Sequence, residues 1–164
     1  PKAFGEVKEA GDGRIIDLEI ETMQNRIRLV ETKAKPGDGA DIEKAEVLVA
    51  VGLGADQEDL PLAARLAALL GGELGCSKPV ATDRKWLSEE RLIGLSGKKC
   101  KPRLAIVLGI SGQVQFMVGL REAKVIVAVN SDENANIMQM ADYKMVARIK
   151  DVLPELTAQL QTLV

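Results

Sequence analysis

A glycine-rich turn, Gly109-Ile110-Ser111-Gly112, follows an apolar stretch typical of a buried strand and precedes a segment typical of a helix. Glycines let backbone N–H groups approach an anion closely, the start of a helix adds partial positive charge, and Ser111 adds a hydroxyl. The same pattern also fits a plain tight turn between a strand and a helix. It is neither the dinucleotide fingerprint G-x-G-x-x-G nor a loop ending in Gly-Lys-Ser/Thr. The turn is therefore a candidate phosphate site.

Three further places carry polar groups that could serve the same ligand. Residues 93–98 (IGLSGK) combine two glycines, a hydroxyl and a lysine, so they form either an anion-binding nest or a plain solvent loop. Lys78 follows Ser77 at the end of an apolar stretch and is either a cation facing a ligand or a solvated charge. Asn130 ends another apolar stretch, where its amide bonds either a ligand or its own turn.

Alternating strands and helices would position these groups. The apolar runs predict strands over 46–51, 73–77, 103–108, 124–129 and 143–147, with helices over 58–70, from the Gly109 turn to about 120, over 135–139 and over 152–163. Nearly continuous apolar strands that alternate with helices are typical of a parallel sheet. Right-handed crossovers bring the turns that follow such strands to one edge. The prediction is an α/β fold: a three-layer, Rossmann-like nucleotide-binding domain with helices on both faces of its sheet.

The first 45 residues differ from this pattern. Residues 26–33 (RIRLVETK) alternate polar and apolar positions, which predicts an exposed or edge strand, and turn residues flank them. The chain also begins with Pro1. We expect residues 1–45 to be an extended lead-in from a missing N-terminal domain, and residues 46–164 to form the nucleotide-binding domain.

Composition narrows the classes of function. Two cysteines and no histidine exclude the usual zinc, haem and histidine-based acid–base sites, and we expect Cys76 to be buried. A net charge of −2 without a basic block disfavours a nucleic-acid partner. No apolar run approaches the roughly 20 residues that span a bilayer. The few cysteines fit a reducing, cytoplasmic compartment. A bound cofactor is therefore the simplest source of function.

Six segments, taken in order, resemble the C-terminal domain of the electron transfer flavoprotein alpha subunit. They are GCSK (75–78), GLSGK (94–98), LGISGQVQF (108–116), VAVNSD (127–132), QMADY (139–143) and VLPEL (152–156), and the resemblance covers roughly residues 43–160. It implies FAD bound across the carboxyl edge of the sheet and a beta subunit as partner. It also implies an electron carrier, rather than a substrate-converting enzyme, that serves acyl-CoA-type or similar dehydrogenases.

The resemblance also implies which residues contact the cofactor. Ser96 matches a threonine near flavin N5, the turn from Ser111 to Gln115 matches one around the pyrophosphate and ribityl, and Asn130 matches an asparagine near the adenosine half. The complete predicted set is Ser77, Lys78, Ile93, Gly94, Leu95, Ser96, Ser111, Gly112, Gln113, Val114, Gln115, Phe116 and Asn130.

Five positions depart from the family's pattern. Lys78 replaces an arginine over the flavin ring, Leu95 a glutamine and Phe116 a histidine at the pyrimidine edge. Leu53 replaces the arginine of a G-R-G turn, and Arg148 an aspartate near the adenosine. Each lost polar contact costs about 1–3 kcal/mol.

Three hypotheses follow. The first is an FAD-binding electron carrier in which Lys78 tunes the flavin. The alternative is a divergent structural or assembly module with weak or no flavin binding. A nicotinamide-dependent enzyme is the third, and the absence of both a G-x-G-x-x-G turn and histidine argues against it.

Overall fold

The computed structural model describes residues 13–19, 30–32 and 39–162. Contacts divide the chain into two units, Pro1–Lys35 and Pro36–Val164. In the first unit, residues 13–19 and 30–32 are exposed and form neither helix nor strand. The strand expected over 26–33 therefore has no counterpart at 30–32, and its other residues lie outside the described part of the chain.

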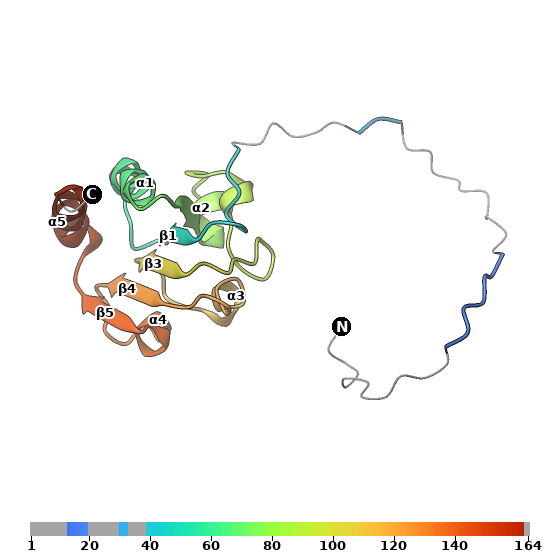
Figure 1. The fold of residues 1–164 in the computed structure, drawn as a ribbon. Coiled ribbons are helices and arrows are strands. Elements are labelled where there is room, and N and C mark those ends of the chain that lie inside the picture. The colour runs from blue at the N-terminus through green and yellow to red at the C-terminus, as the bar shows by residue number, and fades with distance from the viewer. Residues whose placement is uncertain (1–12, 20–29, 33–38, 163–164) are drawn as a thin grey trace. The chain divides into compact units, whose positions relative to one another are not determined.

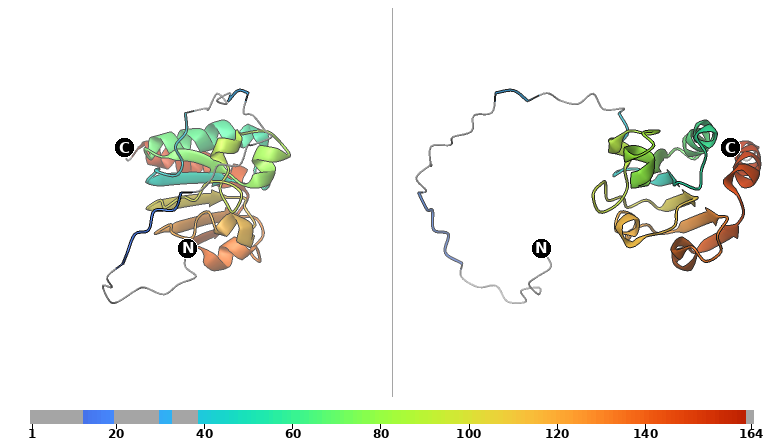
Figure 2. Two further views of the ribbon diagram at one scale, coloured as in Figure 1. Left: turned by 90° about the vertical axis from the view of Figure 1, so that its right-hand side faces the viewer. Right: turned by 180° about the vertical axis from the view of Figure 1, so that it is seen from behind.

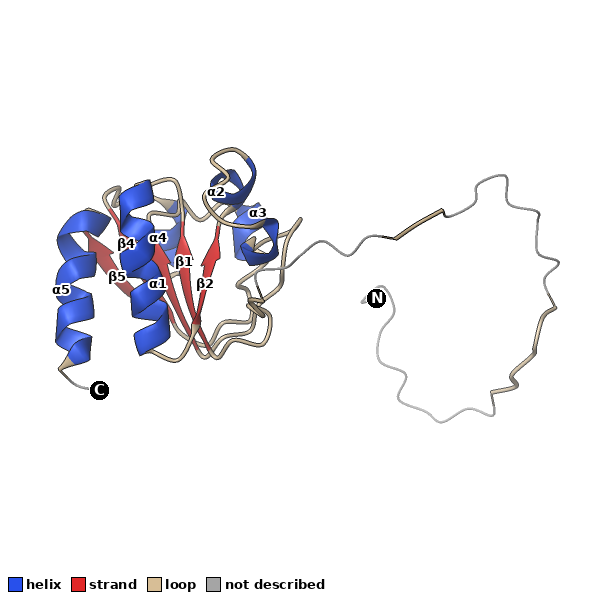
Figure 3. Ribbon diagram, turned by 90° about the horizontal axis from the view of Figure 1, so that it is seen from above, coloured by secondary structure: helices blue, strands red, loops and turns tan. Residues whose placement is uncertain are grey.

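The second unit contains a five-stranded sheet in which all neighbouring strands are parallel (Figures 1 and 3). The strands stand in the order β2-β1-β3-β4-β5. Their bounds are β1 (Val47–Val51), β2 (Glu73–Cys76), β3 (Leu104–Leu108), β4 (Ile126–Asn130) and β5 (Tyr143–Val146). Each of the five expected strands is present, so the predicted parallel α/β fold is confirmed.

Alternate residues of the strands face two helix layers, because successive side chains of a strand point to opposite faces. Val49, Val51 and Leu108 pack in one apolar cluster with α1 (Leu60–Leu69) and α5 (Ile149–Gln161). Leu48 and Val107 pack in the other, with α3 (Val114–Met117) and α4 (Asn136–Met140). Figure 2 shows the sheet between these layers, as predicted. Within the described residues, no helix combines the length and apolar character needed to cross a membrane.

Three helices differ from expectation. α2 (Lys78–Thr82) was not predicted, although Pro79 suits the first turn of a helix. α3 ends at Met117 rather than near 120, and the Gly119 carbonyl that follows accepts the Cys100 N–H at 2.8 Å. α5 begins at Ile149, before the predicted 152, and contains Pro154 in its interior. The helix thus begins three residues before the predicted start, and Pro154 lies within it rather than in its first turn.

The chain changes direction across the sheet between β1 and β3. β2 pairs with one side of β1 and β3 with the other, which makes this the switch point where parallel α/β sheets hold ligands. The turns after these two strands touch, because the Gly54 N–H donates to the Gly109 carbonyl at 2.9 Å. A Cβ atom at Gly54 would lie 2.8 Å from the Gly109 Cα, so only glycine permits this approach.

Candidate functional site

A cavity of about 650 Å³ lies at the carboxyl edge of the sheet, next to this switch point. Its lining comes from the turn after β1, the start of α2, the loop before β3, the turn after β3 and the end of β4. All predicted site residues except Gly112 and Val114 line it: Ser77, Lys78, Ile93, Gly94, Leu95, Ser96, Ser111, Gln113, Gln115, Phe116 and Asn130. The fold thus brings together the predicted residues from four separate segments of the chain, as the parallel topology predicts.

Gly112 supports the cavity without lining it. Its φ is +80°, a left-handed value that residues with a side chain rarely adopt. A Cβ atom there would lie 2.3 Å from the Ile137 N atom, at the start of α4. Val114, the first residue of α3, is 75% exposed. Gly112 therefore shapes the turn, while Val114 lies beside it.

The turn after β3 presents backbone amides to the candidate site. No hydrogen bond between described residues uses the N–H groups from Ser111 to Gln115. Because α3 has only four residues, a large helix dipole is not available, contrary to the sequence expectation. The amides themselves are therefore the donors that this turn offers an anion.

The loop over residues 93–98 is closed by its own hydrogen bonds. The Gly94 N–H donates to the Lys98 carbonyl at 3.1 Å, and the Leu95 N–H donates to the Gln115 carbonyl at 2.7 Å. The Gly97 N–H donates to the Gly94 carbonyl at 3.1 Å. Because these bonds use three of the loop's amides, they favour the plain loop over an anion-binding nest. Four residues of the loop line the cavity: Ile93, Gly94, Leu95 and Ser96. Among them, Ser96 carries a hydroxyl group.

The side chain of Lys98 pairs with a carboxylate outside the cavity. Its Nζ lies 3.0 Å from Glu43 Oε2, and this carboxylate raises the pKa of the Lys98 ammonium above its ordinary value. Lys98 does not line the cavity. The sequence alone could not reveal this pairing, since the two residues are 55 positions apart.

Lys78 supplies the positive side chain of the cavity. It is exposed at the start of α2, and no ion pair between described residues involves it. Asp83 and Asp132 also line the cavity, so its lining carries one positive and two negative side chains. Side-chain charge alone does not favour an anionic ligand here. Binding such a ligand therefore depends on Lys78 together with the backbone amides.

The other four positions that depart from the family's pattern also lie on or near the cavity. Leu53, Leu95 and Phe116 all line the cavity, where Leu53 and Leu95 are 54% and 63% exposed and Phe116 is buried. Arg148 precedes α5, and its Nε lies 2.8 Å from Asp151 Oδ2. Arg148 also lines a second hollow of about 220 Å³, which shares Gly54 and Gly109 with the main cavity.

Nine lining residues lie outside the predicted set. Four of them, Leu53, Gly54, Gly109 and Ile110, belong to the turns after β1 and β3. The other five lie elsewhere. Pro79, Thr82 and Asp83 belong to α2 or follow it, and Asp132 and Ala135 follow β4. The signal for the residues at α2 was present, because Ser77 followed by Pro79 is typical of a helix start. No local pattern indicated that Asp132 and Ala135 would reach the cavity.

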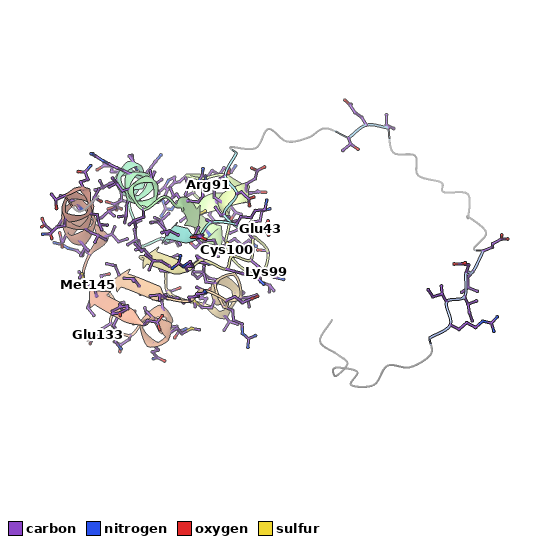
Figure 4. All side chains as sticks on the ribbon, in the orientation of Figure 1. Glu43, Arg91, Lys99, Cys100, Glu133 and Met145 are labelled. Atoms are coloured by element: carbon purple, nitrogen blue, oxygen red, sulfur yellow. The ribbon has the colours of Figure 1, made fainter. Side chains whose placement is uncertain are left out.

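Neither cysteine lines the cavity. Both are buried, which confirms the expectation for Cys76. Burial, and to a smaller extent the Glu43 carboxylate, raise the pKa of the Cys100 thiol to about 11. Figure 4 shows Glu43 and Cys100 on the same side of the domain. Among the described residues, no group of three histidine, cysteine, aspartate or glutamate side chains could hold a metal ion.

The parallel sheet with a cavity at its switch point places the domain in the class of Rossmann-like α/β folds, which hold ligands at this position. Residues 41–121 match the family model described as the electron transfer flavoprotein FAD-binding domain. The chain belongs to the electron transfer flavoprotein alpha-subunit family.

Two curated relatives illustrate this similarity. YdiR of Escherichia coli (strain K12), assigned by name as an electron transfer flavoprotein subunit, is 49% identical over 131 residues. Protein FixB of Escherichia coli O9:H4 (strain HS) is 44% identical over 130 residues. Each alignment covers 79% of this chain and 42% of the relative. The chain therefore spans less than half the length of these relatives.

Proposed function

We propose that this domain binds FAD in the cavity at the carboxyl edge and serves as an electron carrier. The observation that carries the proposal is the run of N–H groups from Ser111 to Gln115, which bond no described residue beside a cavity of about 650 Å³. That volume is within the range of cofactor sites in proteins. A bound flavin supplies redox chemistry that no side chain of the cavity provides.

The residues present fit such a cofactor in distinct ways. The turn from Ser111 to Gln115 would hold the phosphates through its amides, and Lys78 would add a positive charge at the same cavity. Ser96 and Gln115 would donate or accept hydrogen bonds. Leu95 and Phe116 provide apolar surface for a ring system.

The partners belong to the same proposal. We propose that an electron transfer flavoprotein beta subunit completes the assembly and that an acyl-CoA-type or similar dehydrogenase donates the electrons. The family assignment supports the beta subunit. The donor and the acceptor rest on the resemblance alone.

A visible absorption spectrum of the purified chain, before and after incubation with excess FAD and desalting, tests the binding. Retained yellow flavin in about one equivalent supports the proposal. A colourless chain that stays colourless when the beta subunit is added would refute it.

The alternative function is a structural or assembly module with weak or no flavin binding. The charge of the cavity favours it, because Asp83 and Asp132 outnumber Lys78. Stable assembly with the beta subunit in the absence of FAD, together with no flavin uptake by the complex, would establish this alternative.

A further inference from the structure

The side chain of Asn130 is engaged at both ends by the protein. It is only 8% exposed at the end of β4. Its Nδ2 donates to the Ile110 carbonyl at 2.9 Å, and its Oδ1 accepts from the Asp132 N–H at 3.0 Å. Asn130 therefore ties the turn after β3 to the turn after β4.

The bond to Ile110 controls the direction of a neighbouring amide. In a planar trans peptide, the carbonyl of one residue and the N–H of the next point in opposite directions, and the described chain has no cis peptide. The group that holds the Ile110 carbonyl thus also sets where the Ser111 N–H points. That N–H is the first of the amides offered by the turn.

Backbone groups anchor the two neighbouring carbonyls in the same way. The Gly109 carbonyl accepts from the Gly54 N–H at 2.9 Å, and the Ser111 carbonyl accepts from the Ile137 N–H at 3.1 Å. Three consecutive carbonyls are thus held from outside the turn. Asn130 supplies the one side-chain donor among the three, so it is the anchor that a substitution can remove.

We infer that Asn130 is a positioning residue for the cofactor, acting through the turn by holding the Ile110 carbonyl and fixing the direction of the Ser111 amide. The inference rests on the proposed FAD binding. Of the two interpretations left open by the sequence, the bonds from the Asn130 amide to its own and a neighbouring turn support the second.

Two variants of Asn130 test the role. Asn130→Ala removes both bonds. Asn130→Asp keeps an oxygen to accept from the Asp132 N–H, but an ionised carboxylate cannot donate to the Ile110 carbonyl. We expect both variants to bind FAD about tenfold more weakly than the wild type at pH 8, by flavin fluorescence titration. Asn134→Asp is the matched control, because Asn134 is exposed on the same connection, and its affinity should not change.

The pH dependence separates positioning from simple charge repulsion. Once protonated, the carboxyl group of the Asn130→Asp variant can donate to Ile110 while still accepting from Asp132. Burial and the facing carbonyl both raise its pKa. Between pH 8 and about pH 5, the affinity of this variant should therefore approach that of the wild type. The charged groups on the cavity are Lys78, Asp83 and Asp132. Those on the adjoining hollow are Asp56, Asp59, Arg148 and Lys150. These groups are present in every variant. The pH dependence measured for the wild type and for Asn130→Ala therefore gives their contribution, which is subtracted from that of Asn130→Asp.

Two binding outcomes would overturn the inference. Wild-type affinity in Asn130→Ala would show that the turn does not need this anchor. An Asn130→Asp variant that stays as weak as Asn130→Ala at low pH would show that donation to Ile110 is not what matters.

Amide hydrogen exchange tests the same role without flavin. In Asn130→Ala, the Gly54 and Ile137 amides that bond the turn should exchange about tenfold faster or more. The Gly72 amide, which donates to the Ala67 carbonyl at the end of α1, is the reference and should not change. Equal acceleration at all three amides would refute a local role. If the wild type binds no FAD, the proposed function fails, yet this exchange pattern still decides whether Asn130 positions the turn.

Discussion

Replacing Gly112 with alanine should disrupt the candidate site through two separable effects. The first is backbone strain, because a left-handed residue with a side chain costs about 1–2 kcal/mol, and Gly112 has φ of +80°. The second is a clash, because the new Cβ atom would lie 2.3 Å from Ile137 N and 2.7 Å from Ile137 Cα. These are backbone atoms, so they cannot move aside as a flexible side chain can.

Gly71 offers a matched control for the strain. It follows α1 with φ of +64°, and a Cβ atom there would meet nothing within 4 Å. Gly71→Ala should therefore lower the free energy of unfolding by about 1–2 kcal/mol, through strain alone. Gly112→Ala should cost about 1–3 kcal/mol more, the usual range for forcing extra atoms into a packed site.

Urea unfolding and FAD titration of both variants provide the measurements. The extra loss in Gly112→Ala should come with a weakened FAD affinity, since displacement of Ile137 moves the donor that holds the Ser111 carbonyl. Gly71→Ala should bind FAD as the wild type does. Equal unfolding free energies for the two variants would refute the packing argument, and an unchanged FAD affinity in Gly112→Ala would refute the role of this turn.

Three further predictions address charge and reactivity. Lys78→Ala should weaken FAD binding and lower the flavin reduction potential, because a cation at the cavity stabilises the negative charge that reduction adds. Spectroelectrochemistry measures the potential. Lys124→Ala is the control: Lys124 lies at the amino edge of the sheet, and its replacement should change neither the affinity nor the potential. Glu43→Gln should return the raised pKa of Lys98 towards 10.5, which NMR titration of Lys98 would follow. Because the folded pKa is raised, the pair stabilises the fold fully below the unfolded pKa, and this stability is lost as the pH rises through the folded pKa. An advantage of the wild type over Glu43→Gln that persisted after Lys98 had lost its proton would contradict this assignment. Burial and a pKa of about 11 should keep the Cys100 thiol unreactive to alkylation at pH 8 until urea unfolds the chain, and rapid alkylation of the native protein would argue against the burial.

The amino-acid sequence by itself determined the strands and the edge at which the site would form. β3 (LAIVL) is apolar at every position because both faces of a central parallel strand are buried. A strand of this kind can therefore be recognised from its own five residues, without knowledge of its neighbours. Glycine turns after β1 and β3 were equally visible, and right-handed crossovers then bring them to one edge. The site residues predicted at this edge therefore lie around one cavity with few exceptions.

Only the tertiary structure decided which polar groups remain available to a ligand. Lys98 bonds Glu43, and Asn130 bonds Ile110, 20 positions away. The loop amide of Leu95 is likewise used by the Gln115 carbonyl. Local sequence shows which donors and acceptors a segment carries, but their partners come from segments that only the folded sheet brings together. The amides from Ser111 to Gln115, which bond no residue in the described part of the chain, are the donors that this long-range pairing leaves for a ligand. They could therefore be recognised only in the fold.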